Sequence, residues 1–335
     1  MGPGENAPGV SVIVISKDRH ELLLKSITAL RELRYPADSY EIVVVEEGDG
    51  PLPIDGVHYV FLPRRNLGLG YARNMGLDAA KGEIIAFTDD DTRVDPDWLS
   101  ELAAPFADPA VNGVAGLTRA QESGLIGETE EILGVPGGGI ARLLSTSGEL
   151  VETRSLSACN CAYRGAVARG IRFKEDSYGR IGGEDWYMAE MVCSRGKCVF
   201  TPRAVVYHKP RADLFRLVHT FYRREACAHL AAREYYHRSR TQYFTDKGFG
   251  LVTGRILSAA VIAALAGPLW LPPLFVLYYF AVLWKKRRLF PLVRHKPAFF
   301  LVPLTNLAVQ AGILKAELEI LFTGGTKAER ILRKF

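Results

Sequence analysis

Three successive aspartates, Asp89, Asp90 and Asp91, directly follow a short apolar run and are the residues best suited to chemistry in this sequence. Asp89 and Asp91 are two residues apart in extended chain, so their carboxylates point to the same side. Two convergent carboxylates suit a hard divalent cation, whose other ligands can be diphosphate oxygens. The same residues would also suit a solvated acidic turn, because Asp95-Pro96-Asp97 looks like the start of a helix.

A second acidic pair, Glu184 and Asp185, follows a glycine-rich stretch and precedes the helix expected over Tyr187–Arg195. A carboxylate at this place can act as a general base that removes a proton from an attacking hydroxyl. It can also be a helix N-cap, a role that needs no catalysis. Both roles are compatible with the sequence.

The five cysteines do not form a secreted disulfide framework. Cys159 with Cys161, and Cys193 with Cys198, could bind a metal as thiolates, but these spacings are not the usual zinc pairs. We therefore expect reduced, partly buried thiols. The composition, 48% hydrophobic and 24% charged, also excludes a disordered chain.

Short β-branched runs alternate with amphipathic stretches through the first ninety residues. The alternation predicts βαβ units, hence an α/β, Rossmann-like fold with a mostly parallel sheet and helices on both faces. The expected strands are Val10–Ser16, Glu41–Val45, Val57–Leu62 and Glu83–Thr88, and the expected helices are His20–Leu33 and Gly70–Ala80. A dinucleotide-binding fingerprint fails, because Arg73 stands where G-x-G-x-x-G requires its third glycine.

Polar clusters follow three of the expected strands. They are Ser16-Lys17-Asp18, Glu46-Glu47 and Asp89-Asp90-Asp91. In open α/β sheets ligands bind beyond the carboxyl ends of the strands, so the three clusters indicate one binding edge.

Several motifs, in this order, resemble the family 2 glycosyltransferases of the GT-A fold. They are Arg65-Asn66-Leu67-Gly68, Ala72-Arg73-Asn74-x-Gly76, Lys81-Gly82-Glu83 and Asp89-x-Asp91. Three later segments are similar to the acceptor half of that family: Asn160–Arg164, Gly183-Glu184-Asp185 and Pro202–His208. The resemblance covers roughly residues 10–210, and it implies a GT-A nucleotide-sugar transferase domain over residues 1–210.

The resemblance also implies a role for each matched residue. Those on the donor side would be Ser16, Asp18, Glu46, Glu47, Arg73, Asp89 and Asp90. Those that bind the metal would be Asp91, His208 and Asp89. Asp185 would be the catalytic base, and the acceptor side would hold Asn160, Glu184 and Trp186. Glu46 and Glu47 stand where the family usually has two aspartates.

The implied activity is inverting, metal-dependent transfer of a hexose, with a lean to mannose or glucose, from a GDP- or UDP-linked donor. One carboxylate would be the base and Mn²⁺ or Mg²⁺ would stabilise the departing diphosphate. A glycosidase would need two carboxylates flanking the scissile bond. The alternatives are a processive polysaccharide synthase, although Gln-x-x-Arg-Trp is absent, and a non-catalytic, membrane-tethered nucleotide-sugar binding protein, which would have no use for Asp185.

The charge of the chain is unevenly divided. Residues 203–335 hold 22 Lys and Arg against 7 Asp and Glu, a net of +15, while residues 1–202 hold 20 and 30, a net of −10. Two uncharged runs, 256–284 and 298–314, flank the basic cluster that begins at Lys285. Such runs beside basic residues are typical of membrane elements, although a buried core helix has the same pattern.

We therefore expect basic amphipathic interfacial helices over 211–255 and transmembrane or re-entrant helices over 256–335. The partners would be a bilayer with anionic head groups and a lipid-linked acceptor, and nucleic acid is disfavoured because the basic residues adjoin apolar runs. A helix packed on the catalytic domain is the alternative for 211–255. Met1–Gly9 contains no apolar stretch of a secretory signal, so we expect a membrane protein with its catalytic domain on the cytoplasmic side.

Overall fold

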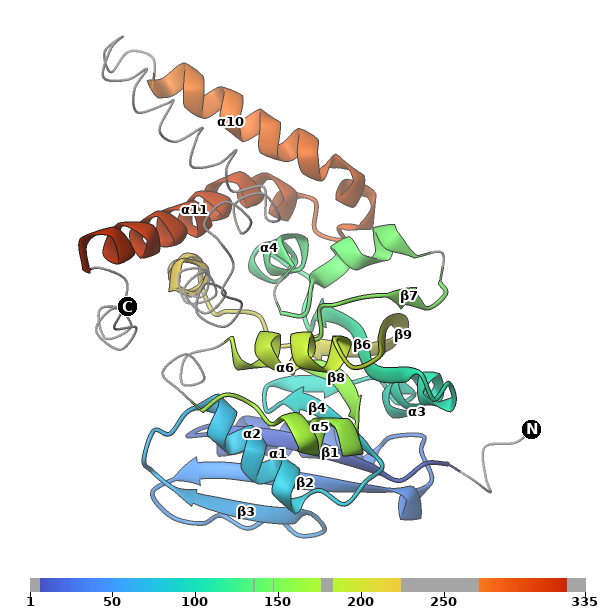
Figure 1. Ribbon diagram of the computed structural model, residues 1–335. Helices are drawn as coiled ribbons and strands as arrows, with labels where there is room; N and C mark the ends of the chain where they lie inside the picture. Colours follow the sequence, from blue (N-terminus) through green and yellow to red (C-terminus); the bar gives the residue numbers. More distant parts are fainter. Residues whose placement is uncertain (1–6, 135, 147, 176–182, 224–270, 324–335) are drawn as a thin grey trace. The chain divides into compact units, whose positions relative to one another are not determined.

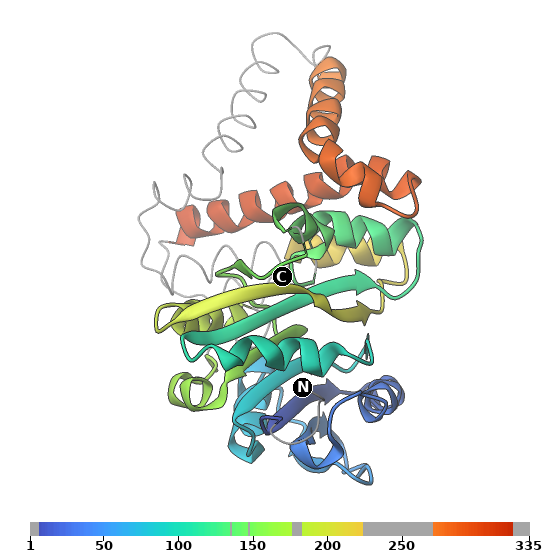
Figure 2. The ribbon, with the colours of Figure 1, turned by 90° about the vertical axis from the view of Figure 1, so that its right-hand side faces the viewer.

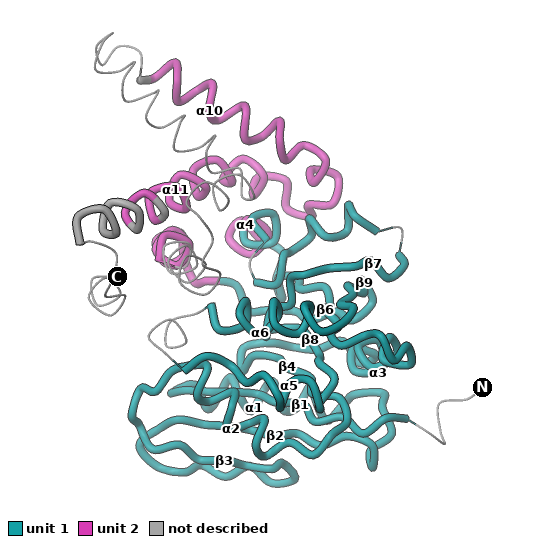
Figure 3. The backbone as a smooth tube through the Cα atoms, in the orientation of Figure 1, with its two compact units in different colours: residues 1–123, 130–210 teal, residues 124–129, 211–335 magenta. Residues whose placement is uncertain are grey.

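A computed structural model of the 335-residue chain describes residues 7–134, 136–146, 148–175, 183–223 and 271–323 (Figure 1). The chain divides into two compact units, coloured separately in Figure 3. The first unit comprises residues 1–123 and 130–210, and the second comprises residues 124–129 and 211–335.

The first unit contains a nine-stranded sheet with the order β3-β2-β1-β4-β8-β6-β9-β5, and β7 pairs with β9. The strands are β1 Val10–Lys17, β2 Tyr40–Gly48, β3 His58–Pro63, β4 Ile84–Asp89, β5 Thr92–Val94, β6 Val111–Ala120, β7 Val151–Glu152, β8 Asn160–Arg164 and β9 Lys197–His208. The four strands and two helices expected before residue 90 are present, each within three residues of its predicted bounds.

The sheet is mixed, so the expected parallel pairing is present in only part of it. Strands β3, β2, β1 and β4 are parallel neighbours, and β6 is parallel to β9. However, β8 runs antiparallel to both β4 and β6, and β5 and β7 run antiparallel to β9. The strand–helix alternation that predicts parallel pairing extends only to β4, and β8 enters beside β4 from a much later part of the chain.

Helices cover both faces of the sheet. Helices α1 (His20–Arg31) and α3 (Trp98–Ala103) pack in one apolar core, while α2 (Leu69–Ala79), α5 (Gly165–Ile171) and α6 (Glu184–Cys193) pack in the other. Figure 2 shows blue α1 and yellow-green α6 on opposite sides of the strands. In β1, Val12 and Val14 enter the first core and Ile13 and Ile15 the second, which explains its uninterrupted apolar sequence. Three 3-10 turns complete this unit, η1 Ala37–Ser39, η2 Ala104–Ala107 and η3 Gly139–Ser145.

The second unit is helical where the structure describes it. Its elements are a helix over 214–223, α10 Leu271–Lys286, the 3-10 turn η5 Arg287–Leu292, α11 Pro297–Thr323 and residues 125–129 of α4 (Leu125–Leu133). The hydroxyl of Tyr279 in α10 donates to the carbonyl of Phe300 in α11 at 2.8 Å. Buried Glu128 lies 3.4 Å from Arg294 and accepts a hydrogen bond from the backbone N–H of His295 at 2.8 Å.

Within the residues that the structure describes, no helix is long and apolar enough to cross a membrane. The spanning helix expected at 298–314 is therefore not supported, and α11 carries the polar residues Thr305, Asn306 and Gln310 there. Residues 256–270 of the first uncharged run, and residues 224–255 of the segment expected to form interfacial helices, lie outside the described residues.

Candidate active site

The polar clusters at the carboxyl ends of β1, β2 and β4 lie at one edge of the sheet. These strands are parallel neighbours, and their register places Ser16 beside Glu46 and Ile15 beside Asp89. The residues after the strands therefore meet at the same place, as the sequence predicts.

The middle aspartate, Asp90, is fully buried and holds the aspartate turn in place. Its carboxylate accepts a hydrogen bond from the hydroxyl of Ser16 at 2.7 Å and lies 2.7 Å from the guanidinium of Arg19. Burial raises the pKa of Asp90 to about 7, although Arg19 and Ser16 oppose this. Asp90 and Ser16, both expected on the donor side, are thus hydrogen-bonded to each other.

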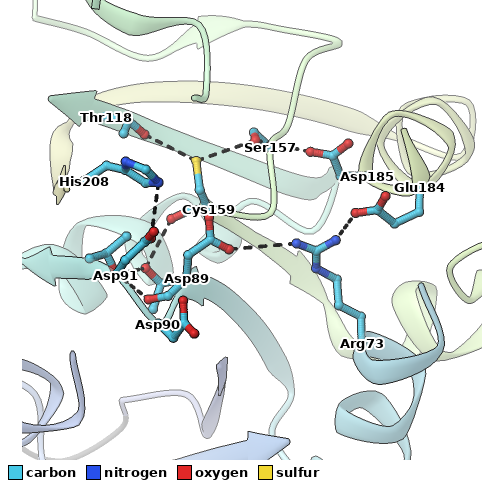
Figure 4. Close-up of polar contacts among 12 residues, drawn as sticks. Arg73, Asp89, Asp90, Asp91, Thr118, Ser157, Cys159, Glu184, Asp185 and His208 are labelled. Atoms are coloured by element: carbon cyan, nitrogen blue, oxygen red, sulfur yellow. Dashed lines mark hydrogen bonds and ion pairs between the residues drawn. The ribbon is translucent and has the colours of Figure 1, made fainter. Parts of the chain in front are cut away.

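The structure brings Asp89, Asp91 and His208 together (Figure 4). Each offers one ligand atom, and the three atoms lie within 4.8 Å of one another. Burial and the neighbouring carboxylate of Asp91 raise the pKa of Asp89, while Arg73, His208 and Arg19 oppose this shift. Two carboxylates and an imidazole are a donor set that fits Mn²⁺ or a similar divalent cation.

Arg19 was not among the residues singled out from the sequence. It is the N-cap residue of α1, and its guanidinium bridges Asp90 at 2.7 Å and Asp91 at 2.9 Å. Its side chain is 48% exposed, so it borders the space beside the aspartates. Its position directly after the Ser16-Lys17-Asp18 cluster is the signal that would have identified it.

Arg73 lies between Asp89 and Glu184 (Figure 4). It comes from α2, is 6% exposed, forms an ion pair with Glu184 and lies 3.9 Å from the carboxylate of Asp89. Burial alone would lower the pKa of Arg73, but the carboxylates of Glu184, Asp89 and Asp185 outweigh it, so the pKa is raised. Arg73 therefore remains charged inside the protein.

Glu184 and Asp185 begin α6 but have different surroundings. Glu184 is 2% exposed, and burial raises its pKa to about 7 while Arg73 opposes the shift. Asp185 is partly exposed and accepts a hydrogen bond from the hydroxyl of Ser157 at 3.2 Å. The next residue, Trp186, is partly exposed as well. Of the two carboxylates, Asp185 is therefore the more accessible from outside the protein.

Cys159 and Thr118 lie near Ser157 at the centre of the site (Figure 4). The thiol of Cys159 is 3.5 Å from the hydroxyl of Ser157 and 3.7 Å from that of Thr118. Burial raises the pKa of Cys159 to about 12, so this thiol is neutral. Neither Ser157 nor Thr118 carries a sequence signal, because the pairing of β6 with β8 brings them here.

The other residues expected on the donor side are held by neighbours at the sheet edge. Arg64 binds the carboxylate of Asp18 through two contacts of 2.5 and 2.6 Å. Glu46 lies 2.9 Å from the ring of His20 and accepts from the hydroxyl of Tyr59 at 2.7 Å. Glu47 accepts from the backbone N–H groups of residues 65 and 66, at 3.0 and 2.7 Å, and so anchors that loop.

Asn160, expected on the acceptor side, lies instead in the core. It is 2% exposed, accepts from the indole N–H of Trp98 at 2.8 Å, and donates to the carbonyls of Leu117 and Ala204 at 3.0 and 3.1 Å. These bonds join β8 to β6, β9 and α3, so the amide of Asn160 has a structural role. The four described cysteines are free thiols, and Cys227 lies outside the described residues.

Residues 11–131 match the family model described as Glycosyl transferase family 2. The succinoglycan biosynthesis protein ExoM of Rhizobium meliloti is 29% identical over 214 residues, which cover 57% of this chain and 64% of ExoM. Glycosyltransferase AglE of Haloferax volcanii is 29% identical over 119 residues, which cover 32% of this chain and 39% of AglE. The match spans less than two thirds of the length of either relative.

The fold resembles that of mannosyltransferase PcManGT from Pyrobaculum calidifontis, solved in complex with GDP-Man and Mn²⁺. The TM-score is 0.59 at 19% identity, and the match covers 96% of this chain and 89% of that one. At this identity the likeness shows a GT-A-like α/β fold. The family model and the curated relatives agree in relating the N-terminal part of the chain to glycosyltransferases. Residues 11–131 are thus similar to the glycosyl transferase family 2 domain.

Proposed function

We propose that the protein transfers a single sugar, with inversion, from a nucleotide sugar to an acceptor hydroxyl. The observation that supports this proposal is that the site contains both a cluster of metal-binding side chains and a separate carboxylate. Asp89, Asp91 and His208 form a cluster suited to a divalent cation, and Asp185 is a single, partly exposed carboxylate near it. An inverting transfer needs one base for the acceptor and charge stabilisation for the departing diphosphate.

In this mechanism Asp185 accepts the proton of the acceptor hydroxyl as the new bond forms. The hydrogen bond from Ser157 orients the carboxylate of Asp185. Asp89, Asp91 and His208 would hold Mn²⁺ or Mg²⁺, which when bound neutralises charge on the diphosphate. Arg19, whose guanidinium lies 2.9 Å from Asp91, would add positive charge near the same group.

The proposed donor is a GDP- or UDP-linked hexose, with mannose and glucose as the first candidates. The GDP-Man and Mn²⁺ bound by PcManGT support GDP-mannose and Mn²⁺ as the first pair to test. The experiment is a panel of GDP- and UDP-sugars with Mn²⁺, read out as release of the nucleotide. Release from one donor that stops when Mn²⁺ is chelated would support the proposal. Nucleotide binding without release from any donor would overturn it in favour of a binding protein.

The proposed acceptor is lipid-linked, at the cytoplasmic face of a membrane with anionic head groups. In α10, the side chains of Leu277, Phe280 and Trp284 are 62–69% exposed. The adjoining basic residues are Lys285, Lys286, Arg287, Arg288, Arg294 and Lys296. An exposed apolar face next to basic residues is typical of a helix that lies at a bilayer surface. Sedimentation with vesicles that contain 30% anionic lipid, against neutral vesicles, tests this: binding to neither would contradict it.

A further inference from the structure

The ion pair of Arg73 and Glu184 joins two parts of the site that lie far apart in the sequence. Arg73 comes from α2, and Glu184 is the first residue of α6, directly before Asp185. The side chains of Arg73 and Glu184 are only 7% and 2% exposed. A second contact, at 3.9 Å, leads from Arg73 to Asp89. A continuous line of charged contacts therefore connects the cation cluster with the helix that carries the proposed base.

The ion pair is formed by the first residue of α6, Glu184. Gly183, the N-cap residue, has a left-handed backbone (φ 104°), and no side chain in the described part of the chain caps the helix. Asp185 is one residue, about 100° of helix rotation, beyond Glu184. Whatever fixes Glu184 therefore also fixes the direction in which Asp185 points.

The surroundings of Arg73 leave it little freedom to bind a nucleotide directly. Its Nη1 atom binds Glu184, its Nη2 atom faces Asp89, and its guanidinium lies 5.7 Å from the ring centre of Phe173. The other carboxylate oxygen of Glu184, Oε2, is buried and has no hydrogen-bond partner among the described residues. A buried pair that leaves an oxygen unsatisfied is a poor means of stabilising a fold, and this favours a role in the site.

We propose that Arg73 and Glu184 are positioning residues: their ion pair holds the first turn of α6 so that Asp185 faces the acceptor at a fixed place relative to Asp89. This inference rests on the proposed function. It reassigns Arg73, which the family resemblance would place on the nucleotide.

The test compares wild type with Glu184→Gln and with the double variant Arg73→Met/Glu184→Met, which removes both charges and keeps the volume. Three quantities are measured: hydrogen exchange of the amides of residues 185–189, the Kd for GDP or UDP with Mn²⁺, and kcat and KM for nucleotide release from the best donor of the panel. The control is Glu190→Gln. Glu190 lies near the other end of α6 and pairs with Arg154 at 2.5 Å, on a more exposed surface.

We expect amide exchange in the first turn of α6 to rise at least tenfold in both variants. We expect kcat to fall at least a hundredfold, while the Kd for the nucleotide and the donor KM stay within threefold and Glu190→Gln behaves as wild type. Because a single variant could misfold, the double variant must unfold cooperatively for its kinetics to count.

Two results would overturn the inference. A nucleotide Kd raised tenfold or more in the double variant, with kcat unchanged, would make Arg73 a nucleotide ligand. Unchanged exchange and unchanged kcat would mean that the pair does not position α6. If exchange rises but the wild-type protein releases no nucleotide from any donor, the contact holds α6 as inferred and the proposed function is what fails.

Discussion

Oδ1 of Asp91 lies 3.2 Å from Nε2 of His208, and the sheet itself fixes this closeness. His208 is the last residue of β9, and β9 pairs with β5, where Thr92 stands opposite His208. Asp91 directly precedes Thr92. Two ligands of the proposed cation site are thus held by paired strands rather than by free loops, which favours a preorganised site.

Asp91→Asn should weaken Mn²⁺ binding about 10- to 100-fold, because it removes a charged oxygen ligand from the site. His208→Gln should weaken it less, since the lost ligand is neutral. Electron paramagnetic resonance of free Mn²⁺, titrated with and without nucleotide, measures both affinities. Asp78→Asn, which alters an exposed aspartate paired with Arg172, is the matched control. Unchanged affinity in Asp91→Asn would rule out this cation site.

Arg19→Gln should bind Mn²⁺ about three- to tenfold more tightly in the absence of nucleotide. Arg19 lies 2.9 Å from Asp91 and competes, as a cation, for the same carboxylate. The same titration measures the effect, and Arg34→Gln, which removes an exposed arginine paired with Asp97, is the control. Weaker binding in Arg19→Gln would mean that Arg19 orders the aspartate turn more than it competes.

Asn160→Ala should lower the free energy of unfolding by about 3 kcal/mol, because it leaves buried partners of its amide unsatisfied at about 1–3 kcal/mol each. The affected groups are the indole N–H of Trp98 and the carbonyls of Leu117 and Ala204. Urea unfolding measures the loss. Mn²⁺ affinity, measured on the folded variant, should be unchanged, and a variant with wild-type stability would refute the structural role.

Cys193 should react with iodoacetamide at a lower pH than Cys159. The sulfurs of Cys193 and Cys198 are hydrogen-bonded at 2.8 Å, and this bond lowers the pKa of Cys193, whereas burial raises the pKa of Cys159 to about 12. A lowered pKa means more thiolate at neutral pH, and thiolate is the reactive form. Peptide mass spectrometry after labelling between pH 6 and 9 gives each rate. Equal rates at both cysteines would contradict the assignment.

The part of the site that the sequence predicts well is the part that parallel strands build. Their carboxyl ends necessarily meet at one edge, so the aspartates after β4 could be grouped with Ser16 and Glu46 from strand order alone. Ser157 could not be found in this way. It reaches Asp185 only because β8 returns antiparallel to β4 and β6, and no local pattern encodes that return.

Asn160 and the C-terminal helices show two features that the sequence patterns did not predict correctly. A motif match gives Asn160 a place in the sequence but not the direction of its side chain, and that direction is into the core. The uncharged run at 298–314 matches a membrane segment in its lack of charge, yet α11 mixes polar residues into it. The absence of charged residues alone does not distinguish a membrane-spanning helix from a helix that does not span.

The central claim, that Asp185 is the base of a metal-dependent sugar transfer, is tested most directly by Asp185→Asn. The variant keeps the size of the side chain and its contact with Ser157, but it cannot accept a proton as readily. We expect its Kd for the donor with Mn²⁺ to stay within threefold of wild type, and its turnover to fall about 10²- to 10⁴-fold, the usual contribution of a general base. Wild-type turnover in Asp185→Asn, at unchanged donor affinity, would contradict the claim.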